Sequence, residues 1–304
     1  MPKTLFIDST PDIDRVWKQV HGPADIPITV GMGPVSEEEV PGKVAGYDTV
    51  INDATYFSEP TLKRCTDLKH IVFLGTGAAS FVDLAAAERL GIKVSTIGGY
   101  GDTTVAEHAM GLVFAAARHI AVMHGVVRSG GWRPMQGMEL RGKTLGVVGL
   151  GGIGREMARI AQGVGLKVIA YNRSPVSGGS VPAVPIDELL AQSDIISLHL
   201  ALNESTRGFL DRAKLEKTRP GVLIVNTARA GIVDEPALIE LLRSGRIGHY
   251  ATDVFGKEPT PPEEPLLTLD NVTLTAHAGY NTPEAAMTMY RRAIDLAAKG
   301  WSTP

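Results

Sequence analysis

A glycine-rich turn between an apolar segment and a helical pattern constrains this chain more than any other feature. Residues 144–154 read Thr-Leu-Gly-Val-Val-Gly-Leu-Gly-Gly-Ile-Gly, and apolar residues then recur every three or four positions. The order strand, tight turn, helix makes a G-x-G-x-x-G sequence a dinucleotide fingerprint rather than a chance match. Gly149 permits the turn, Gly151 lets the backbone approach a pyrophosphate, and Gly154 lets the helix pack close to its strand.

The helix that follows this turn is suited to bind an anion. Its first N–H groups have no partner within the helix, and the helix dipole favours negative charge at that end. A tight strand-to-helix connection without a ligand is the alternative. We expect the cofactor to contact the turn at Gly149, Gly151, Gly152, Ile153 and Gly154.

Composition excludes several classes of protein. The net charge of −3 gives no electrostatic case for binding nucleic acid or an anionic membrane. The single cysteine, Cys65, cannot form an intrachain disulfide, which suits a reducing cytoplasm, and the N-terminus lacks the apolar region of a signal peptide. The long apolar stretch 105–127 contains too many polar residues to span a bilayer. We expect it to be one buried helix and a dimer interface.

Strand and helix patterns alternate along the whole chain, which predicts an α/β fold of two doubly wound parallel-sheet domains. We expect a flavodoxin-like substrate domain over residues 1–100 plus 281–304, and a Rossmann dinucleotide-binding domain over 101–280, with a cleft between them. Helices are expected at 12–20, 37–40, 59–64, 84–90, 237–243 and 283–299. The expected strands are 4–8, 28–32, 49–52, 70–74, 93–97, 144–149, 167–172, 195–199, 222–226, 249–254 and 272–276.

The end of the second strand after residue 140 bears on which dinucleotide binds. NAD-binding proteins commonly place an acidic residue there for the ribose 2′-hydroxyl, but this chain has Asn172, Arg173 and Ser174. The guanidinium of arginine suits a phosphate. The strand end therefore favours NADP(H), with NAD(H) possible. The alternatives are that Arg173 merely faces solvent beside adenine, or that the turn binds S-adenosylmethionine, whose binding proteins usually need an acid at this point.

Polar side chains follow three successive predicted strands. Arg229 follows the strand at 222–226, Glu258 comes shortly after 249–254, and His277 follows 272–276. The carboxyl ends of parallel strands meet at one edge of a sheet, where doubly wound folds bind ligands. A lone histidine at a strand end is more often structural. An arginine, a carboxylate and a histidine together beside a nucleotide turn indicate catalysis.

This set of residues resembles the D-isomer-specific 2-hydroxyacid dehydrogenases, which include glyoxylate/hydroxypyruvate reductases, D-lactate dehydrogenases and phosphoglycerate dehydrogenases. The resemblance extends from about residue 75 to 284. Its motifs are, in order, Gly75-Thr76-Gly77, Val105-Ala106-Glu107-His108, Leu140-Arg141-Gly142-Lys143-Thr144-Leu145, Leu198-His199-Leu200, Val225-Asn226-Thr227-Ala228-Arg229, Asp253-Val254-Phe255, Glu258-Pro259 and His277.

The resemblance implies an enzyme that reduces a small 2-oxo acid, glyoxylate- or hydroxypyruvate-like, to the D-2-hydroxy acid. His277 would be the general acid, Glu258 would orient its imidazole, and Arg229 would bind the substrate carboxylate and carbonyl. Gly75, Thr76 and Gly77 would hold the same carboxylate through their backbone. The other implied cofactor contacts are Thr104, His199, Leu200, Ala228, Asp253 (for the nicotinamide carboxamide) and Gly279.

Two alternatives stay open. One is a dehydrogenase of the same fold that acts on another small anion, a bulkier 2-oxo acid or phosphite; formate is disfavoured because formate dehydrogenases typically carry glutamine at the position of Glu258. The other is a non-catalytic, nucleotide-sensing protein similar to co-repressors of this fold, against which the absence of basic clusters argues. We expect a cytoplasmic homodimer that binds a small-molecule 2-oxo or 2-hydroxy acid and no nucleic acid, membrane or metal.

Overall fold

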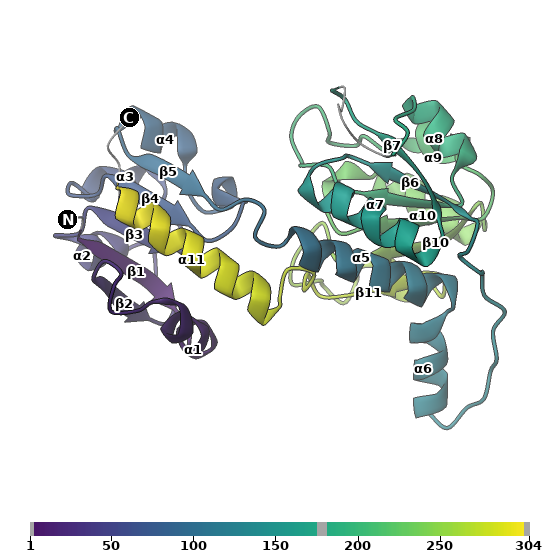
Figure 1. Ribbon diagram of the computed structural model, residues 1–304, viewed down its shortest axis with the longest axis horizontal. Coiled ribbons are helices and arrows are strands. Elements are labelled where there is room, and N and C mark those ends of the chain that lie inside the picture. Colours follow the sequence, from purple (N-terminus) through teal and green to yellow (C-terminus); the bar gives the residue numbers. More distant parts are fainter. Residues whose placement is uncertain (1–2, 175–180, 301–304) are drawn as a thin grey trace. The chain divides into compact units, whose positions relative to one another are not determined.

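The chain folds into two units, each built on one parallel sheet. The structure, a computed structural model, describes residues 3–174 and 181–300 (Figure 1). Unit 1 comprises Met1–Tyr100 and Asn281–Pro304, and unit 2 comprises Gly101–Tyr280. The C-terminal helix therefore belongs to the unit that contains the N-terminal strand.

Unit 1 has the strand order β2-β1-β3-β4-β5, and all its neighbouring strands are parallel. This is the flavodoxin-like order 2-1-3-4-5 of a doubly wound sheet. Its elements are β1 (Thr4–Ser9), α1 (Pro11–Val20), β2 (Ile28–Met32), α2 (Val40–Val44), β3 (Thr49–Asn52), α3 (Glu59–Arg64), β4 (His70–Phe73), the 3₁₀ turn η1 (Ala78–Ser80), α4 (Leu84–Arg89), β5 (Lys93–Thr96) and α11 (Pro283–Lys299).

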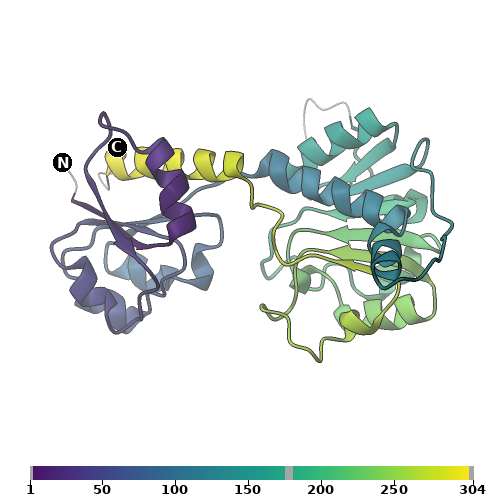
Figure 2. The same ribbon diagram turned by 90° about the horizontal axis from the view of Figure 1, so that it is seen from below.

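Both faces of the unit 1 sheet are covered by helices because successive strand residues point to opposite faces. On β1, Leu5 and Ile7 pack with α2, α3 and α4. Phe6 packs on the other face against Trp17 of α1, which in turn contacts Tyr290 of α11. Figure 2 shows α1 and α11 side by side on that face. The strands consequently read as nearly continuous apolar runs.

Unit 2 has the strand order β11-β10-β9-β8-β6-β7. Beyond β7, Ala183 forms an isolated parallel bridge with Ala170, and counting that segment as a third strand gives the classic order 3-2-1-4-5-6 with one strand added. The elements are α5 (Asp102–Ala117), α6 (Ile120–Arg128), β6 (Thr144–Val148), α7 (Gly152–Val164), β7 (Lys167–Tyr171), α8 (Ile186–Gln192), β8 (Ile195–Leu198), α9 (Arg212–Lys217), β9 (Val222–Asn226), η2 (Ala230–Ile232), α10 (Glu235–Arg243), β10 (Ile247–Thr252), η3 (Pro265–Thr268) and β11 (Val272–Leu274).

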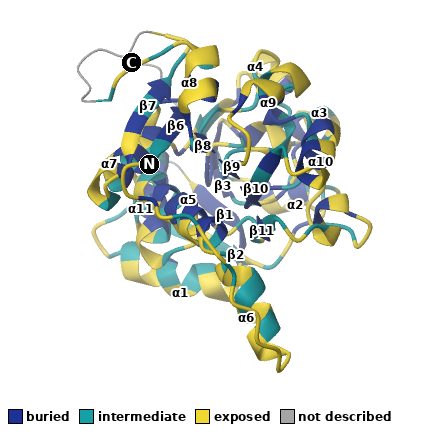
Figure 3. Ribbon diagram, turned by 90° about the vertical axis from the view of Figure 1, so that its right-hand side faces the viewer, coloured by how far each residue is buried: buried dark blue, intermediate teal, exposed yellow. Residues whose placement is uncertain are grey.

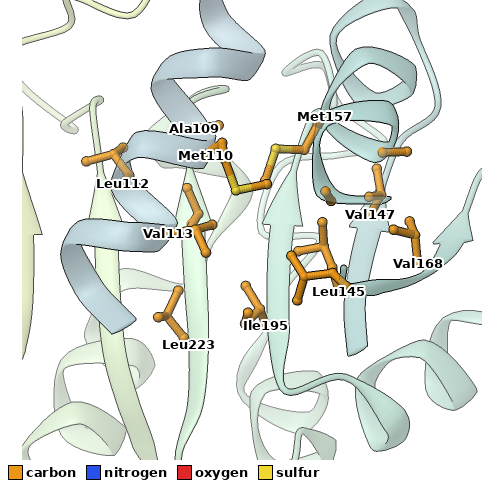
Figure 4. Packing of buried hydrophobic residues seen from close by; sticks show 14 of the residues in the cluster. Ala109, Met110, Leu112, Val113, Leu145, Val147, Met157, Val168, Ile195 and Leu223 are labelled. Atoms are coloured by element: carbon orange, nitrogen blue, oxygen red, sulfur yellow. The ribbon is translucent and has the colours of Figure 1, made fainter. Parts of the chain in front are cut away.

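Helix α5 forms much of the core of unit 2. Met110 and Val113 of α5 lie with Met157 of α7 and with Leu145 and Ile195 of the sheet in one buried cluster (Figure 4). Helices α8, α9 and α10 contribute to a second cluster, on the other face of the same strands. These two clusters fix the strand ends that carry the candidate site residues.

The expectation of a single buried helix over 105–127 is wrong. Helix α5 ends at Ala117, and His119 adopts a left-handed φ of +51° before α6 begins. Helix α6 extends away from the sheet and buries none of its residues, so its apolar side chains Ile120 and Val127 are about half exposed (Figures 1 and 3). In the described part of the chain, α5 and α6 reach the length and apolarity of a membrane span only as a pair bent by 65°, and no single helix does.

Smaller differences concern where elements begin and end. The helix expected at 37–40 is instead α2 at Val40–Val44, because Ser36 and Glu39 close a hydrogen-bonded turn and Pro41 then occupies the first turn of the helix. Strand β10 begins at Ile247 and ends at Thr252, earlier than the expected 249–254. The other expected strands and the helix Pro283–Lys299 agree within two residues.

Two histidines are buried within the sheets. His70 of β4 bonds to the Ser95 hydroxyl at 2.8 Å, and His249 of β10 bonds to the Thr273 hydroxyl at 2.9 Å. Burial, with Lys93 near the first and His119 near the second, lowers the pKa of each to about 4. Burial next to Asp8 acts in the opposite direction on Asp53, whose pKa it raises to about 6.

We expect His249 to make the fold sensitive to acid. Its folded pKa lies below its unfolded value, so its contribution to stability is complete above about pH 6.5 and is lost as the pH falls towards 4. The variant His249→Gln removes one titrating proton, and its unfolding free energy should depend on pH less steeply than that of the wild type, by up to about 1.4 kcal/mol per pH unit. Urea titrations at pH 4.5 to 7.5 measure this, and equal slopes would contradict it.

Candidate active site

The glycine turn has the geometry that a pyrophosphate site requires. Gly149 has a φ of +101°, and a Cβ there would lie 2.7 Å from the carbonyl oxygen of His199. A Cβ on Gly154 would overlap the carbonyl oxygen of Gly149, which explains the close approach of α7 to β6. A Cβ on Gly151 would meet no atom within 4 Å, so open space lies at the N-terminus of α7. The residues present therefore fit a dinucleotide phosphate.

The neighbouring turn residues have other partners. A Cβ on Gly152 would overlap the carboxylate of Asp102, and the Ile153 side chain packs against the core of unit 2. The Leu200 side chain would lie 3.1 Å from a Cβ on Gly149. The His199 ring bonds to the Ser197 hydroxyl at 2.8 Å. His199 and Leu200 thus lie beside the turn.

The end of β7 carries two kinds of polar side chain. Asn172 accepts a hydrogen bond from the Leu150 N–H at 3.2 Å and donates one to the Ser174 carbonyl at 2.8 Å, so it holds the turn. Arg173 is exposed and donates to the Ser205 hydroxyl at 3.1 Å. Arg173, Ser174 and Ser205 together offer exposed donors and no carboxylate.

Arg229 is positioned through Asn226, which is fully buried at the end of β9. The Asn226 amide donates to the Arg229 carbonyl at 3.0 Å and to the Tyr250 hydroxyl at 3.1 Å, and its oxygen accepts from the Ala228 N–H at 3.0 Å. The Arg229 guanidinium bonds to the Ala228 carbonyl at 2.6 Å. Asn226 therefore fixes the segment that presents both residues.

Glu258 and His277 form a hydrogen-bonded pair of a carboxylate and a histidine. The His277 Nδ1 atom lies 2.6 Å from Glu258 Oε2, and both side chains are about one-third exposed. The other Glu258 oxygen accepts from the Phe255 N–H at 2.9 Å. His277 adopts a left-handed φ of +50°, a conformation that non-glycine residues rarely adopt and that clusters at functional sites. The Nδ1 atom of the ring is thus engaged by Glu258, and the Nε2 atom is the ring's other site for a hydrogen bond.

Asp253 is hydrogen-bonded to the backbone of Ala278 and Gly279, the two residues that follow His277. Burial alone would raise its pKa, but hydrogen bonds from His108, Thr275 and the N–H groups of Ala278 and Gly279 lower it to about 2. The carboxylate is therefore ionised. His108 belongs to a motif of the sequence, but its contacts with Thr275 and Asp253 join residues far apart in the chain and could not be predicted from spacing.

The remaining expected residues have definite places. Thr104 lies in the first turn of α5, and a Cβ on Gly279 would lie 3.0 Å from Asp253 Oδ2, so a side chain there would press on that carboxylate. Gly75, with a φ of +131°, follows β4 in unit 1. Among the residues described, Thr76 and Gly77 have no acceptor bonded to their N–H groups. Within residues 3–174 and 181–300, no three His, Cys, Asp or Glu side chains are placed to hold a metal ion.

Comparison with known proteins identifies the family. Residues 110–279 match the family described as D-isomer specific 2-hydroxyacid dehydrogenase, NAD binding domain. The chain is 42% identical over 241 residues to a hydroxypyruvate reductase of Thermotoga maritima, covering 78% of each protein. It is 37% identical over 270 residues to a D-3-phosphoglycerate dehydrogenase of Archaeoglobus fulgidus, covering 86% of this chain but only half the length of that relative.

A solved structure agrees over nearly the full chain. The pyruvate reductase of Chlamydomonas reinhardtii superimposes with a TM-score of 0.85 at 29% identity, covering 98% of this chain and 96% of that one. Sequence and fold lead to the same assignment. This chain belongs to the D-isomer specific 2-hydroxyacid dehydrogenase family.

Proposed function

We propose that the protein is an NAD(P)-dependent reductase of a small 2-oxo acid, glyoxylate- or hydroxypyruvate-like, and that it forms the D-2-hydroxy acid. The observation that carries this proposal is the 2.6 Å contact between Glu258 and His277, in the same unit as a glycine turn that fits a dinucleotide. An isolated turn would be compatible with a nucleotide sensor. An exposed histidine paired with a carboxylate adds a group that transfers protons.

His277 acts as the general acid. Glu258 accepts from Nδ1 and orients the imidazole, so that Nε2 can deliver a proton to the carbonyl oxygen. A nicotinamide, when bound, supplies the hydride. Arg229 binds the carboxylate and carbonyl of the 2-oxo acid with the two parallel N–H groups of its guanidinium.

The cofactor and substrate are held largely by backbone groups. The N-terminus of α7 binds the pyrophosphate, with Thr104, His199, Leu200, Ala228 and Gly279 as further contacts. Asp253 Oδ2 accepts one hydrogen bond, from Gly279, and retains capacity for a carboxamide N–H. The N–H groups of Thr76 and Gly77, next to Gly75, bind the substrate carboxylate. Unit 1 is thus assigned as the substrate domain and unit 2 as the dinucleotide-binding domain.

The preferred cofactor is NADP(H). Arg173 and Ser174 are exposed at the end of β7, and Ser205 lies within 3.1 Å of Arg173. A 2′-phosphate there meets a guanidinium and hydroxyls rather than a carboxylate. The side chain of Asn172 is bonded to the turn and makes no contact with the phosphate in this proposal. Because it is neutral, it does not repel a 2′-phosphate as a carboxylate would.

The proton-donor and anion-binding roles are tested by NADPH oxidation, followed at 340 nm, with a panel of 2-oxo acids. A separate assay follows reduction of NADP+ by phosphite, which tests the alternative substrate. We expect turnover with glyoxylate or hydroxypyruvate, and His277→Ala should lower kcat by about 10²- to 10⁴-fold while cofactor binding survives.

Arg229→Lys should lower kcat/KM by about 10- to 100-fold, since an ammonium cannot replace the planar fork. Undiminished turnover of either variant would remove that residue from the mechanism.

Cofactor preference is tested with Arg173→Ala. Loss of one charged hydrogen-bond partner should raise the KM for NADPH by about tenfold or more and change the KM for NADH little. Arg141→Ala, which changes an exposed arginine outside the turn, is the control. Equal effects on both cofactors would refute a 2′-phosphate site at Arg173.

Helix α6 is assigned as a homodimer contact of a cytoplasmic protein. It exposes Ile120 and Val127, and the following loop exposes Trp132 at 86%. Exposed apolar groups gathered on one projecting element indicate an interface. Light scattering should give a dimer that Ile120→Asp with Val127→Asp converts to a monomer; a monomeric wild type would contradict the assignment.

A further inference from the structure

A second contact between a histidine and a carboxylate, that of His108 with Asp253, adjoins the residues that follow His277. The Nε2 atom of His108, in α5, lies 3.0 Å from Thr275 Oγ1 and 3.4 Å from Asp253 Oδ1. The His108 side chain is 26% exposed and that of Asp253 only 2%. The contact joins α5 to the segment after β11, 167 residues away in sequence.

The hydrogen-bond directions in this cluster can be assigned by counting donors and acceptors. Ionised Asp253 only accepts, so the Thr275 hydroxyl, 2.6 Å away, donates its proton to Oδ1. The Thr275 oxygen then accepts from His108. The Nε2 atom of His108 must therefore carry a proton, and it faces a second acceptor in Asp253 Oδ1.

Asp253 connects His108 and Thr275 to the turn formed by residues 277–279. Its Oδ1 accepts from the Ala278 N–H at 2.9 Å and its Oδ2 from the Gly279 N–H at 2.8 Å, the two residues that directly follow His277. These bonds hold the backbone where His277 has its left-handed φ of +50°. The ring of His108 would also lie 3.4 Å from a Cβ on Gly279, so it packs directly against the same turn.

We propose that His108 is a positioning residue, which through Thr275 and Asp253 holds the turn that presents His277. The inference rests on the proposed function for its effect on turnover. Its structural part concerns unit 2 alone. His108 contacts neither the Glu258–His277 pair nor the glycine turn through any hydrogen bond described, so its effect on catalysis is transmitted by the backbone of residues 277–279.

The test compares His108→Leu with His108→Gln in the full chain. Leucine removes the donor, whereas the Gln Nε2 amide can donate from nearly the same place. Glu107→Gln, an exposed neighbour on α5, is the matched control. Amide hydrogen exchange at Ala278 and Gly279 reports the turn, and kcat and KM report catalysis. A melting curve for each variant shows that it is folded.

We expect His108→Leu to speed exchange at Ala278 and Gly279 by about tenfold or more and to lower kcat by a similar factor, with the KM of the 2-oxo acid changing less. His108→Gln and Glu107→Gln should resemble the wild type in both. Unchanged exchange in His108→Leu would overturn the proposal, as would faster exchange with undiminished kcat. Should the wild type reduce no 2-oxo acid, the proposed function fails, and the exchange data alone decide whether His108 holds the turn.

Discussion

The buried carboxylate of Asp253 is the interaction on which the candidate site depends. It directly follows β10 and accepts hydrogen bonds from the Thr275 side chain and from two backbone N–H groups beyond β11. It remains ionised although it is almost inaccessible to water. An unpaired buried charge would cost several kcal/mol, so the donors around it are required for its presence. Their arrangement in turn determines the path of the chain at His277.

The same principle operates at the other strand ends. Asn226 uses both ends of its amide to fix Ala228 and Arg229, and Asn172 does the same for the glycine turn and Ser174. In each case a buried or half-buried asparagine bonds to backbone groups of the segment that follows the strand. The arginine in that segment, Arg229 or Arg173, is exposed. The candidate site residues are thereby carried on loops whose backbones have few alternative conformations.

Sequence patterns predicted the features that depend on residues close together in the chain. The strands are short apolar runs between turns, and the glycine turn is specified by three residues without side chains, so both were found from the sequence, as was the α/β class. The break between α5 and α6 was missed because both segments are apolar, and only the packing of α5 on the sheet distinguishes the buried helix from the projecting one. The hydrogen-bond partners of Asn172 and His108 could not be predicted from the sequence either. These partners lie 22 and 167 residues away in the chain, and only the fold brings them into contact.

A crystal structure with NADPH and oxamate, an unreactive analogue of a 2-oxo acid, tests the central claim most directly. We expect the carboxylate of oxamate to bind the Arg229 guanidinium and its amide oxygen to lie within hydrogen-bond distance of His277 Nε2. The 2′-phosphate of NADPH should lie beside Arg173. Oxamate bound with contacts to neither Arg229 nor His277 would contradict it.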